Sequence, residues 1–395
     1  IERFLFERGC DEMIKRKGYK YRIYPNESQE IVINKTFGSS RKIHNLLLNE
    51  KEAIYELFKD YPELLKSHTY LTPAYYKTIY PYLKEVDSQA LTSAWLNLKN
   101  AFNNFYKGTH KYPRYKSKKN MRHSYTSHTT NNNIRLEGNG IKLPKLGIVK
   151  LRRHRELLNG AIIKAAIISK NATNKYYVSL RIEYEEEIIN IDKDFKQIIG
   201  LDFSLNGFYV NTEGKKANYP MYYINSLKKL AKEQRKLSHK VKGSNRYYYQ
   251  KLKVAKIHEK ISNQRNDFLH QESRRLVNDY DIISVESLDL TEMMKNKYFS
   301  KKISDISYNK FVNYLSYKCE DEGKILHKVD KYYASSKICS NCGTKKKILP
   351  LSMRVYSCEC GNVIDRDHNA AINIATKGMI SYLTKTIEDG IASIA

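Results

Sequence analysis

Gln197-Ile198-Ile199-Gly200-Leu201-Asp202 is the most informative segment of this 395-residue chain. Its apolar residues predict a short buried β-strand, and Asp202 places a carboxylate at the end of that strand. Asn206-Gly207 then predicts a tight turn, and Phe208-Tyr209-Val210 predicts a second strand. We therefore expect a new α/β unit to begin after residue 196, with an acid on its first strand.

A second apolar segment, Asp281-Ile282-Ile283-Ser284-Val285-Glu286, also ends in an acid. If the two segments are neighbouring strands of a parallel sheet, Asp202 and Glu286 lie at one edge of that sheet. A third acid is expected on a helix that packs against the sheet. The Asp365–Ile374 segment is the candidate helix, because its small residues would allow the helix to lie close to the sheet. Within this segment, we predict that Asp367 is the third acid.

Three converging carboxylates suit two Mg²⁺ ions, because Mg²⁺ prefers oxygen ligands and surrounding anions offset the repulsion between two cations. Such sites hydrolyse phosphodiester bonds. Asp202, Glu286 and Asp367 therefore predict a metal-dependent nuclease. Any one of these acids, taken alone, would more commonly lie on the surface or cap a helix. Asp365 is the alternative candidate for the third acid.

Four of the six cysteines form a second cluster. Cys339-Ser340-Asn341-Cys342 and Cys358-Glu359-Cys360 are fifteen residues apart, a spacing that can place four thiolates around one Zn²⁺ at about 2.3 Å. Gly343 and Gly361 follow the two pairs and permit positive φ values. We expect a zinc ribbon whose ion is structural, with a redox pair or unligated thiols as the alternatives. Cys10 and Cys319 are interpreted as incidental.

The charge of the chain indicates a polyanionic partner. Lys and Arg number 70 against 42 Asp and Glu, a formal net charge of +28, and 33 tyrosines are interleaved with them. This excess of positive charge favours binding to any phosphate backbone, and it does not distinguish DNA from RNA or either from a membrane surface. The segment from His110 to His128 predicts a phosphate-binding loop through Arg114, Lys116 and Lys118, although a solvated charge run has the same composition.

Hydrophobicity argues against a membrane or a secreted location. No apolar run approaches the roughly 20 residues that cross a bilayer, and Ile1–Asp11 lacks the apolar core of a signal peptide. We expect a cytoplasmic, nucleoid-associated protein without a membrane partner. Met13 could be the initiator.

The N-terminal half predicts a barrel with a helical insertion. Basic and aromatic residues alternate along Lys17–Pro25, as in a β-strand, and residues 134–190 are predicted to contain further strands. Between them, a helix can begin at Asn26, and a second can run from Asp87 to Gly108. Beyond the barrel, Lys228–Asn278 is expected to be long, basic and helical.

These motifs together resemble the TnpB family of transposon-encoded nucleases, over about residues 13–376. The C-terminal resemblance lies in Ile199–Asp202, Ser284–Leu288, Ser335–Gly343 and Asp365–Ile374, which look like RuvC-type nuclease and zinc-ribbon motifs in that order. The N-terminal resemblance lies in Tyr21–Asn26, Tyr112–Lys118 and Leu143–Gly147, which resemble wedge and recognition modules.

The resemblance implies an α+β multidomain fold. Its parts are a wedge β-barrel (13–26 and 125–196), a helical recognition lobe (27–124), an RNase H-like RuvC domain (197–334 and 363–384) and an inserted zinc ribbon (335–362). It also implies a guide RNA made from the transposon end, a double-stranded DNA target beside a short adjacent motif, and one protein for each RNA. Ser88, Gln89, Thr92, Thr130 and Asn131 match the family's motif-reading surface.

The resemblance further implies that two Mg²⁺ ions are held by Asp202, Glu286 and Asp367, and that one structural Zn²⁺ is held by Cys339, Cys342, Cys358 and Cys360. Two alternatives remain. One is an RNA-guided repressor that has lost nuclease activity, although such relatives typically lack a RuvC acid. The other is an unguided transposase or resolvase.

Overall fold

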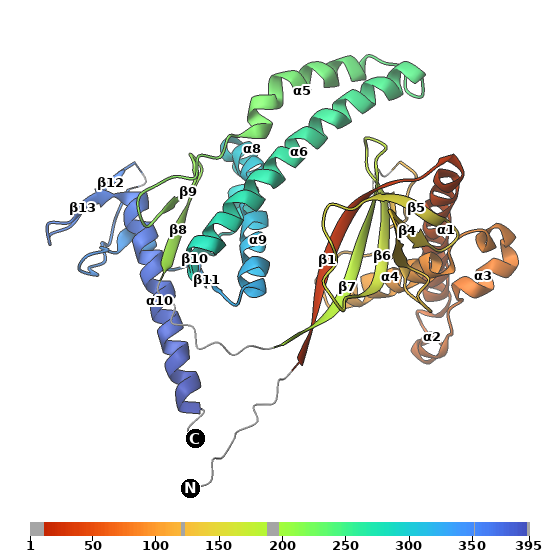
Figure 1. The fold of residues 1–395 in the computed structure, drawn as a ribbon, viewed down its shortest axis with the longest axis horizontal. Coiled ribbons are helices and arrows are strands. Elements are labelled where there is room, and N and C mark those ends of the chain that lie inside the picture. The colour runs from red at the N-terminus through yellow and green to blue at the C-terminus, as the bar shows by residue number, and fades with distance from the viewer. Residues whose placement is uncertain (1–11, 120–122, 188–196, 351, 393–395) are drawn as a thin grey trace, which may run out of the picture. The chain divides into compact units, whose positions relative to one another are not determined.

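The computed structural model describes residues 12–119, 123–187, 197–350 and 352–392, and the chain divides into two compact units at residue 191 (Figure 1). Each unit has its own hydrophobic core. The expected change of fold after residue 196 therefore falls close to the division between the units.

The N-terminal unit is built on a seven-stranded antiparallel sheet in the order β2-β6-β7-β1-β5-β4-β3. Its strands form a half-barrel, and no described pairing joins the two edge strands β2 and β3. The strands are β1 (Glu12–Tyr24), β2 (His123–His128), β3 (Arg135–Glu137), β4 (Gly140–Leu143), β5 (Gly147–Arg152), β6 (Ile162–Lys170) and β7 (Tyr176–Glu187).

The strands expected within residues 134–190 are confirmed as far as Glu187. In β7, Val178, Leu180 and Ile182 are buried while Arg181 between them is exposed, as period-two alternation requires. The expectation of a loop as far as His128 was wrong. His123–His128 forms β2 and pairs with β6, because Tyr125 and Ser127 turn into the core despite the polar composition of the segment.

The helical insertion lies between β1 and β2. It contains α1 (Glu27–Phe58), α2 (Pro62–Ser67), α3 (Pro73–Ile79), a 3₁₀ turn (Pro81–Lys84) and α4 (Ser88–Tyr106). The two predicted helix starts are confirmed. Asn26 and Gln29 form a capping box on α1, and the Asp87 side chain accepts the Gln89 N–H at the start of α4.

The C-terminal unit contains a four-stranded sheet in the order β11-β10-β8-β9. β8 (Ile198–Ser204), β10 (Ile282–Glu286) and β11 (Ile325–Val329) are parallel, and β9 (Phe208–Asn211) forms an antiparallel hairpin with β8. The helices of this unit are α5 (Tyr222–Ser238), α6 (Asn245–Asp279), α7 (Leu290–Met293), α8 (Lys297–Ile306), α9 (Tyr308–Asp321) and α10 (Arg366–Ala392).

The two faces of this sheet are covered by different helices. Ile199, Leu201 and Val285 share a core with residues of α6 and α9, including Leu276 and Phe311. α10 lies on the other face (Figure 1), where Ala371 is close to Gly200 of β8 and Gly378 is close to Ser284 of β10. The basic stretch from Lys228 to Asn278 is helical as expected, but it forms two helices, α5 and α6, that contact each other side by side.

The segment expected to be a zinc ribbon contains a 3₁₀ turn (Ser335–Lys337) and a two-stranded sheet of β12 (Val355–Ser357) and β13 (Val363–Asp365). Because β13 pairs with β12, this hairpin crosses the expected boundary at residue 363. Among the described residues, no helix is long and apolar enough to cross a membrane.

Candidate active site and metal centre

Asp202 and Glu286 occupy equivalent positions on two neighbouring parallel strands. β8 and β10 are paired from Ile198 and Ile282 as far as Leu201 and Val285, and the two acids follow directly. Because side chains alternate along a strand, Asp202 lies on the same face as Gly200, and Glu286 on the same face as Ser284. Both acids therefore face α10 at the carboxyl edge of the sheet.

Two glycines allow α10 to lie directly on this face. A Cβ at Gly200 would come within 2.0 Å of the Ala371 carbonyl oxygen, and one at Gly378 within 1.8 Å of the Ser284 hydroxyl. Gly200 lies in β8, and Gly378 lies in α10 opposite β10. The helix therefore contacts both of the strands that carry the acids. This contact brings the first turn of α10, with Asp367, to the carboxyl edge.

Asp365 and Asp367 have different environments. The Asp365 carboxylate accepts the N–H groups of Asp367 (2.9 Å) and His368 (3.1 Å), and its side chain is exposed. It therefore caps α10. Asp367 is half-buried, and its charge acts on Asp202 more strongly than the charge of Asp365 does.

The electrostatics of Asp202 reflect a crowded group of acids. Burial, followed by the charges of Glu286 and Asp367, raises the pKa of Asp202 to about 9. Burial also raises the pKa of Glu286, which a hydrogen bond from Ser335 partly offsets. Burial, followed by the charges of Glu286 and Asp202, raises the pKa of Tyr308, whose fully buried hydroxyl has no hydrogen-bond partner within the described part of the chain. The neighbouring acids therefore disfavour the ionised form of Asp202, which a nearby cation would stabilise.

Glu286 is tied to the cysteine-containing segment. The Ser335 hydroxyl donates to Glu286 Oε1 at 2.9 Å, and the Ser335 carbonyl accepts from Asn373 Nδ2 at 2.8 Å. Asn373 also donates to the Ile338 carbonyl, next to Cys339. Asn369, one turn earlier on α10, donates to the same carbonyl and accepts the Ser340 N–H. One helix thus carries Asp367 and holds both the first cysteine pair and the residue that contacts Glu286.

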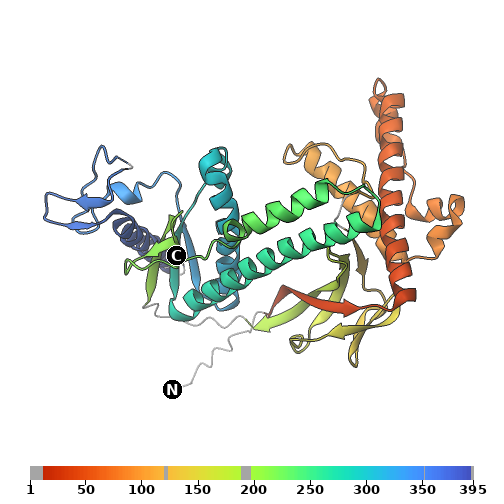
Figure 2. The ribbon, with the colours of Figure 1, turned by 90° about the horizontal axis from the view of Figure 1, so that it is seen from above.

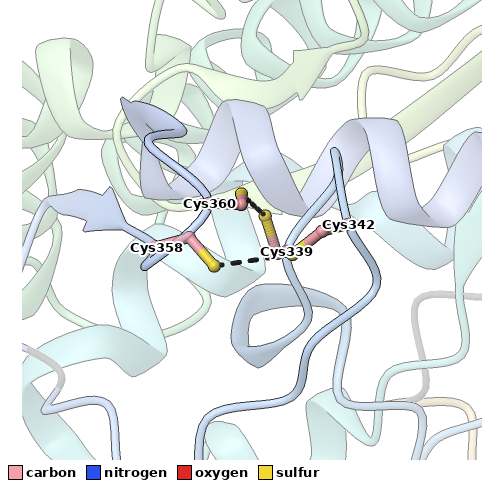
Figure 3. Close-up of side chains that lie close together, drawn as sticks. All are labelled: Cys339, Cys342, Cys358 and Cys360. Carbon is pink, nitrogen blue, oxygen red and sulfur yellow. Dashed lines mark hydrogen bonds between the residues drawn. The ribbon is translucent and has the colours of Figure 1, made fainter.

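The four cysteines meet at one point, as Figure 3 shows. Their sulfur atoms all lie within 4.8 Å of one another, with Cys339 and Cys360 at 3.7 Å and Cys342 and Cys358 at 3.6 Å. Tetrahedral Zn²⁺ with Zn–S bonds of about 2.3 Å requires sulfurs roughly 3.8 Å apart. The residues therefore fit a zinc ion.

Hydrogen bonds from the ribbon backbone and from polar side chains lower the pKa of Cys339 and Cys342, the first cysteine pair. Gly343 and Gly361 have φ values of +74° and +87°, as expected. Burial acts to raise the pKa of Cys339, but N–H groups of Cys342, Asn341 and the Asn362 side chain outweigh it and lower this pKa to about 6. Cys319 is 1% exposed in the core, where burial raises its pKa to about 11, and Cys10 lies outside the described residues.

The oxygens of the acids are spread more widely than the sulfurs. Among the residues that the structure describes, only the four cysteines bring three or more ligand atoms within 4.8 Å of one another. Asp202, Glu286 and Asp367 do not form such a group, although the charges of Glu286 and Asp367 act on Asp202.

In the N-terminal unit, α4 and β2 bring together the two halves of the expected motif-reading surface. α4 contacts β2, and the buried cap residue Asp87 of α4 lies close to the buried Ser127 of β2. Ser88, Gln89 and Thr92 lie in the first turns of α4, and Thr130 and Asn131 lie in the exposed turn that follows β2.

The basic segment after α4 is fixed to α1 through its backbone. Asn45 accepts the Lys116 N–H at 2.8 Å and donates to its carbonyl at 3.0 Å, while His44 donates to the Arg114 carbonyl at 3.2 Å. The side chains of Arg114, Lys116 and Lys118 remain exposed. A backbone held in this way presents cations to the solvent at fixed positions.

Comparison with known proteins identifies the family. A protein of Streptomyces pristinaespiralis named "Putative RNA-guided DNA endonuclease" is 32% identical over 365 residues, which cover 92% of this chain and 90% of that protein. The chain belongs to the TnpB family. A second member, "Putative RNA-guided DNA endonuclease InsQ" of Escherichia coli K12, is 26% identical over 93% of each chain.

Models of three families also match this TnpB chain. They are described as a probable transposase (residues 179–297), a Cas12f1-like TNB domain (308–374) and a helix-turn-helix domain (13–60). The last description differs from the structure, in which these residues form β1 and the long helix α1. A solved chain in a "Cas12f1-sgRNA-target DNA complex" shares the fold, with a TM-score of 0.56 and 13% identity over 92% of this chain and 99% of that one.

Sequence reasoning missed Ser335, Asn369, Asn373 and Tyr308. All four are buried polar residues, and three of them lie within the motifs already singled out. A serine or asparagine gives no sequence signal of whether it contacts a catalytic acid or the solvent.

Proposed function

We propose that this chain is an RNA-guided DNA endonuclease in which Asp202, Glu286 and Asp367 hold two Mg²⁺ ions. The observation that carries the proposal is that Asp202 and Glu286 directly follow the paired segments of two neighbouring parallel strands, on the face that α10 covers, and that the charge of Asp367 in the first turn of α10 acts on the buried Asp202. A surface acid has no such neighbours.

The chain's own residues have distinct roles in this proposal. Asp202 and Glu286 approach the reacting phosphate from the sheet and Asp367 approaches it from α10. Ser335 fixes one oxygen of Glu286 and leaves the other to the site. Metals bound there would activate the attacking water and stabilise the leaving oxygen. The four cysteines would hold one Zn²⁺ that stabilises the ribbon without taking part in chemistry.

The other modules serve guidance. We assign residues 13–26 and 125–196 to a wedge, 27–124 to a recognition lobe, 197–334 and 363–384 to a RuvC-like domain and 335–362 to a zinc ribbon. Ser88, Gln89, Thr92, Thr130 and Asn131 would read a short motif beside the target, while Arg114, Lys116 and Lys118 contact phosphates. A guide RNA bound to one protein pairs with the target strand, so that base pairing reads the sequence and the +28 charge neutralises the backbones.

The proposal is tested by expressing the chain with its flanking DNA, sequencing the co-purified RNA and measuring cleavage of a plasmid that carries the matching target. Cleavage should require the RNA, a matching target and Mg²⁺. Asp202→Asn should retain RNA and target binding and lose cleavage. Cleavage that is independent of RNA would instead favour an unguided transposase or resolvase, the reading suggested by the description of one matching family.

A further inference from the structure

The α5–α6 hairpin is the most basic continuous part of the C-terminal unit. Residues 228–260 contain twelve lysines and arginines and two glutamates, so that about a third of the net charge of +28 falls on 33 residues. Of the two glutamates, Glu233 already accepts hydrogen bonds from Lys236 of the same helix and from Gln250 of α6, and the second of these joins α5 to α6. The hairpin therefore presents a strongly positive surface.

Two hollows on the hairpin gather these cations. The first runs along α5 and is lined by Lys228, Ala231, Lys232, Arg235, Lys236 and His239. Lys228, Lys232, Arg235 and His239 recur every three or four residues and so form one stripe about 16 Å long. All four side chains are exposed, and neither Lys228 nor Lys232 pairs with a carboxylate in the described part of the chain.

The second hollow lies between the helices. Lys229 of α5 meets Lys256 and Lys260 of α6 there, together with polar Asn225, Ser226 and Gln264. Three lysines from two helices repel one another unless an anion lies between them. Such a cleft suits a phosphate group.

The hairpin reaches past the edge of the sheet where the acids lie. Phe208, whose strand partner Ser204 is two residues beyond Asp202, packs against Phe268 with ring centroids 5.5 Å apart. The part of α6 from Asn245 to Phe268, about 35 Å of helix, therefore extends beyond this carboxyl edge, with α5 beside it (Figures 1 and 2).

The base of the hairpin is rigidly fixed. Asp305 of α8 is fully buried and accepts hydrogen bonds from the Tyr219 hydroxyl, from the backbone N–H groups of Tyr223 and Ile224, and from Arg265 of α6. The far end carries Tyr248 and Tyr249, which are 58% and 63% exposed. Exposed aromatic rings beside cations are suited to stacking on unpaired bases of any sequence.

We propose that the α5–α6 hairpin binds single-stranded target DNA and guides it to the acids. The lysine stripe and the cleft contact successive phosphates, and Tyr248 and Tyr249 stack on bases. We favour single-stranded DNA over the guide RNA as the ligand of this hairpin. The hairpin extends from the edge of the sheet that carries the acids, and the DNA strand to be cut must reach that edge. This inference rests on the proposed function and names the surface that delivers its substrate.

The test uses RNA-loaded protein without added Mg²⁺ and a fluorescent single-stranded DNA that does not match the guide. The stripe variant Lys228→Gln/Lys232→Gln/Arg235→Gln is compared with Lys59→Gln/Lys66→Gln/Lys84→Gln, which removes three exposed charges from the helical insertion. Thermal unfolding confirms that both variants are folded. We expect the stripe variant to bind the DNA about tenfold more weakly than the control. A plot of the logarithm of its binding constant against the logarithm of the salt concentration should have a slope that is smaller in magnitude by about two.

A second variant, Tyr248→Leu/Tyr249→Leu, should weaken DNA binding about fivefold without changing the salt slope. Both hairpin variants should bind guide RNA within about twofold of the wild type. DNA affinities equal to that of the control would overturn the proposal, as would a loss of RNA affinity as large as the loss of DNA affinity. If the wild-type protein itself neither holds a guide RNA nor cuts DNA, the proposed function fails instead.

Discussion

Gly200 and Ser335 show how single small residues can decide the geometry of an active site. Gly200 lets the backbone of α10 touch β8 two residues before Asp202, and Ser335 holds Glu286 from the side of the ribbon. Neither residue carries charge, yet each fixes where a carboxylate lies. Both roles can be tested by removing or adding one small group.

Gly200→Ala should destabilise the C-terminal unit by about 1–3 kcal/mol, because the new methyl group overlaps the Ala371 carbonyl and must push α10 off the sheet. Urea unfolding measures the loss, and target cleavage should fall with it. The matched control is Gly18→Ala in β1, where a Cβ meets no atom within 4 Å and stability should be unchanged or slightly higher. Equal effects at the two glycines would contradict the close contact described here.

Ser335→Ala should lower the rate of target cleavage about tenfold, because a hydrogen bond to a charged group is lost. Burial raises the pKa of Glu286, and the hydrogen bond from Ser335 lowers it. Removing this hydrogen bond should therefore raise the pKa of Glu286 further. Glu286 must be ionised to act, and the acid limb of the pH–rate profile should move to higher pH. Ser335→Thr should restore most of the rate. A profile that does not move would assign Ser335 a structural role alone.

Among the elements, α10 connects the group of acids with the four-cysteine ribbon. Its first turn carries Asp367, Asn369 and Asn373 hold the ribbon, and Gly378 lies against β10. A ribbon that unfolds would therefore release Ser335 and disturb Glu286 as well. The zinc ion is expected to act on cleavage through this packing.

Cys339→Ser should reduce bound zinc to well below one ion per chain and lower the melting temperature of the C-terminal unit, since metal binding and ribbon folding are coupled. Elemental analysis and scanning calorimetry are the measurements. Cys319→Ala, which changes a core cysteine outside the cluster, should keep one zinc. Full zinc content in Cys339→Ser would count against the four-cysteine site.

The strands and the cysteine cluster could be predicted because their signals are local. Apolar runs identified β8 and β10, and the spacing of Cys339, Cys342, Cys358 and Cys360 is short enough to imply one site. β2 was missed because Ser, Thr and His dominate a strand whose burial comes from its partners in the sheet. The division of residues 228–278 into two helices was also missed. The partners of Ser335 and Asn373 depend on tertiary contacts that no local pattern encodes.

At the scale of the whole molecule, two units with separate cores contribute different parts of the proposed activity. The half-barrel and its helical insertion carry the candidate motif-reading and phosphate-binding residues, and the second unit carries the acids, the ribbon and the basic hairpin. Family membership and the fold shared with the Cas12f1 complex agree with this division. The activity nevertheless depends on whether three acids from β8, β10 and α10 act as one site.

The pair Asp367→Asn and Asp365→Asn tests this dependence most directly. Both substitutions remove one charge within the same turn, and asparagine can still cap α10 at position 365. With RNA-loaded protein, Mg²⁺ and a matching plasmid, Asp367→Asn should reduce the cleavage rate by at least about a thousandfold, because a metal ligand is lost. Asp365→Asn should cut within a few-fold of the wild-type rate. Cleavage by Asp367→Asn at the wild-type rate would contradict the account.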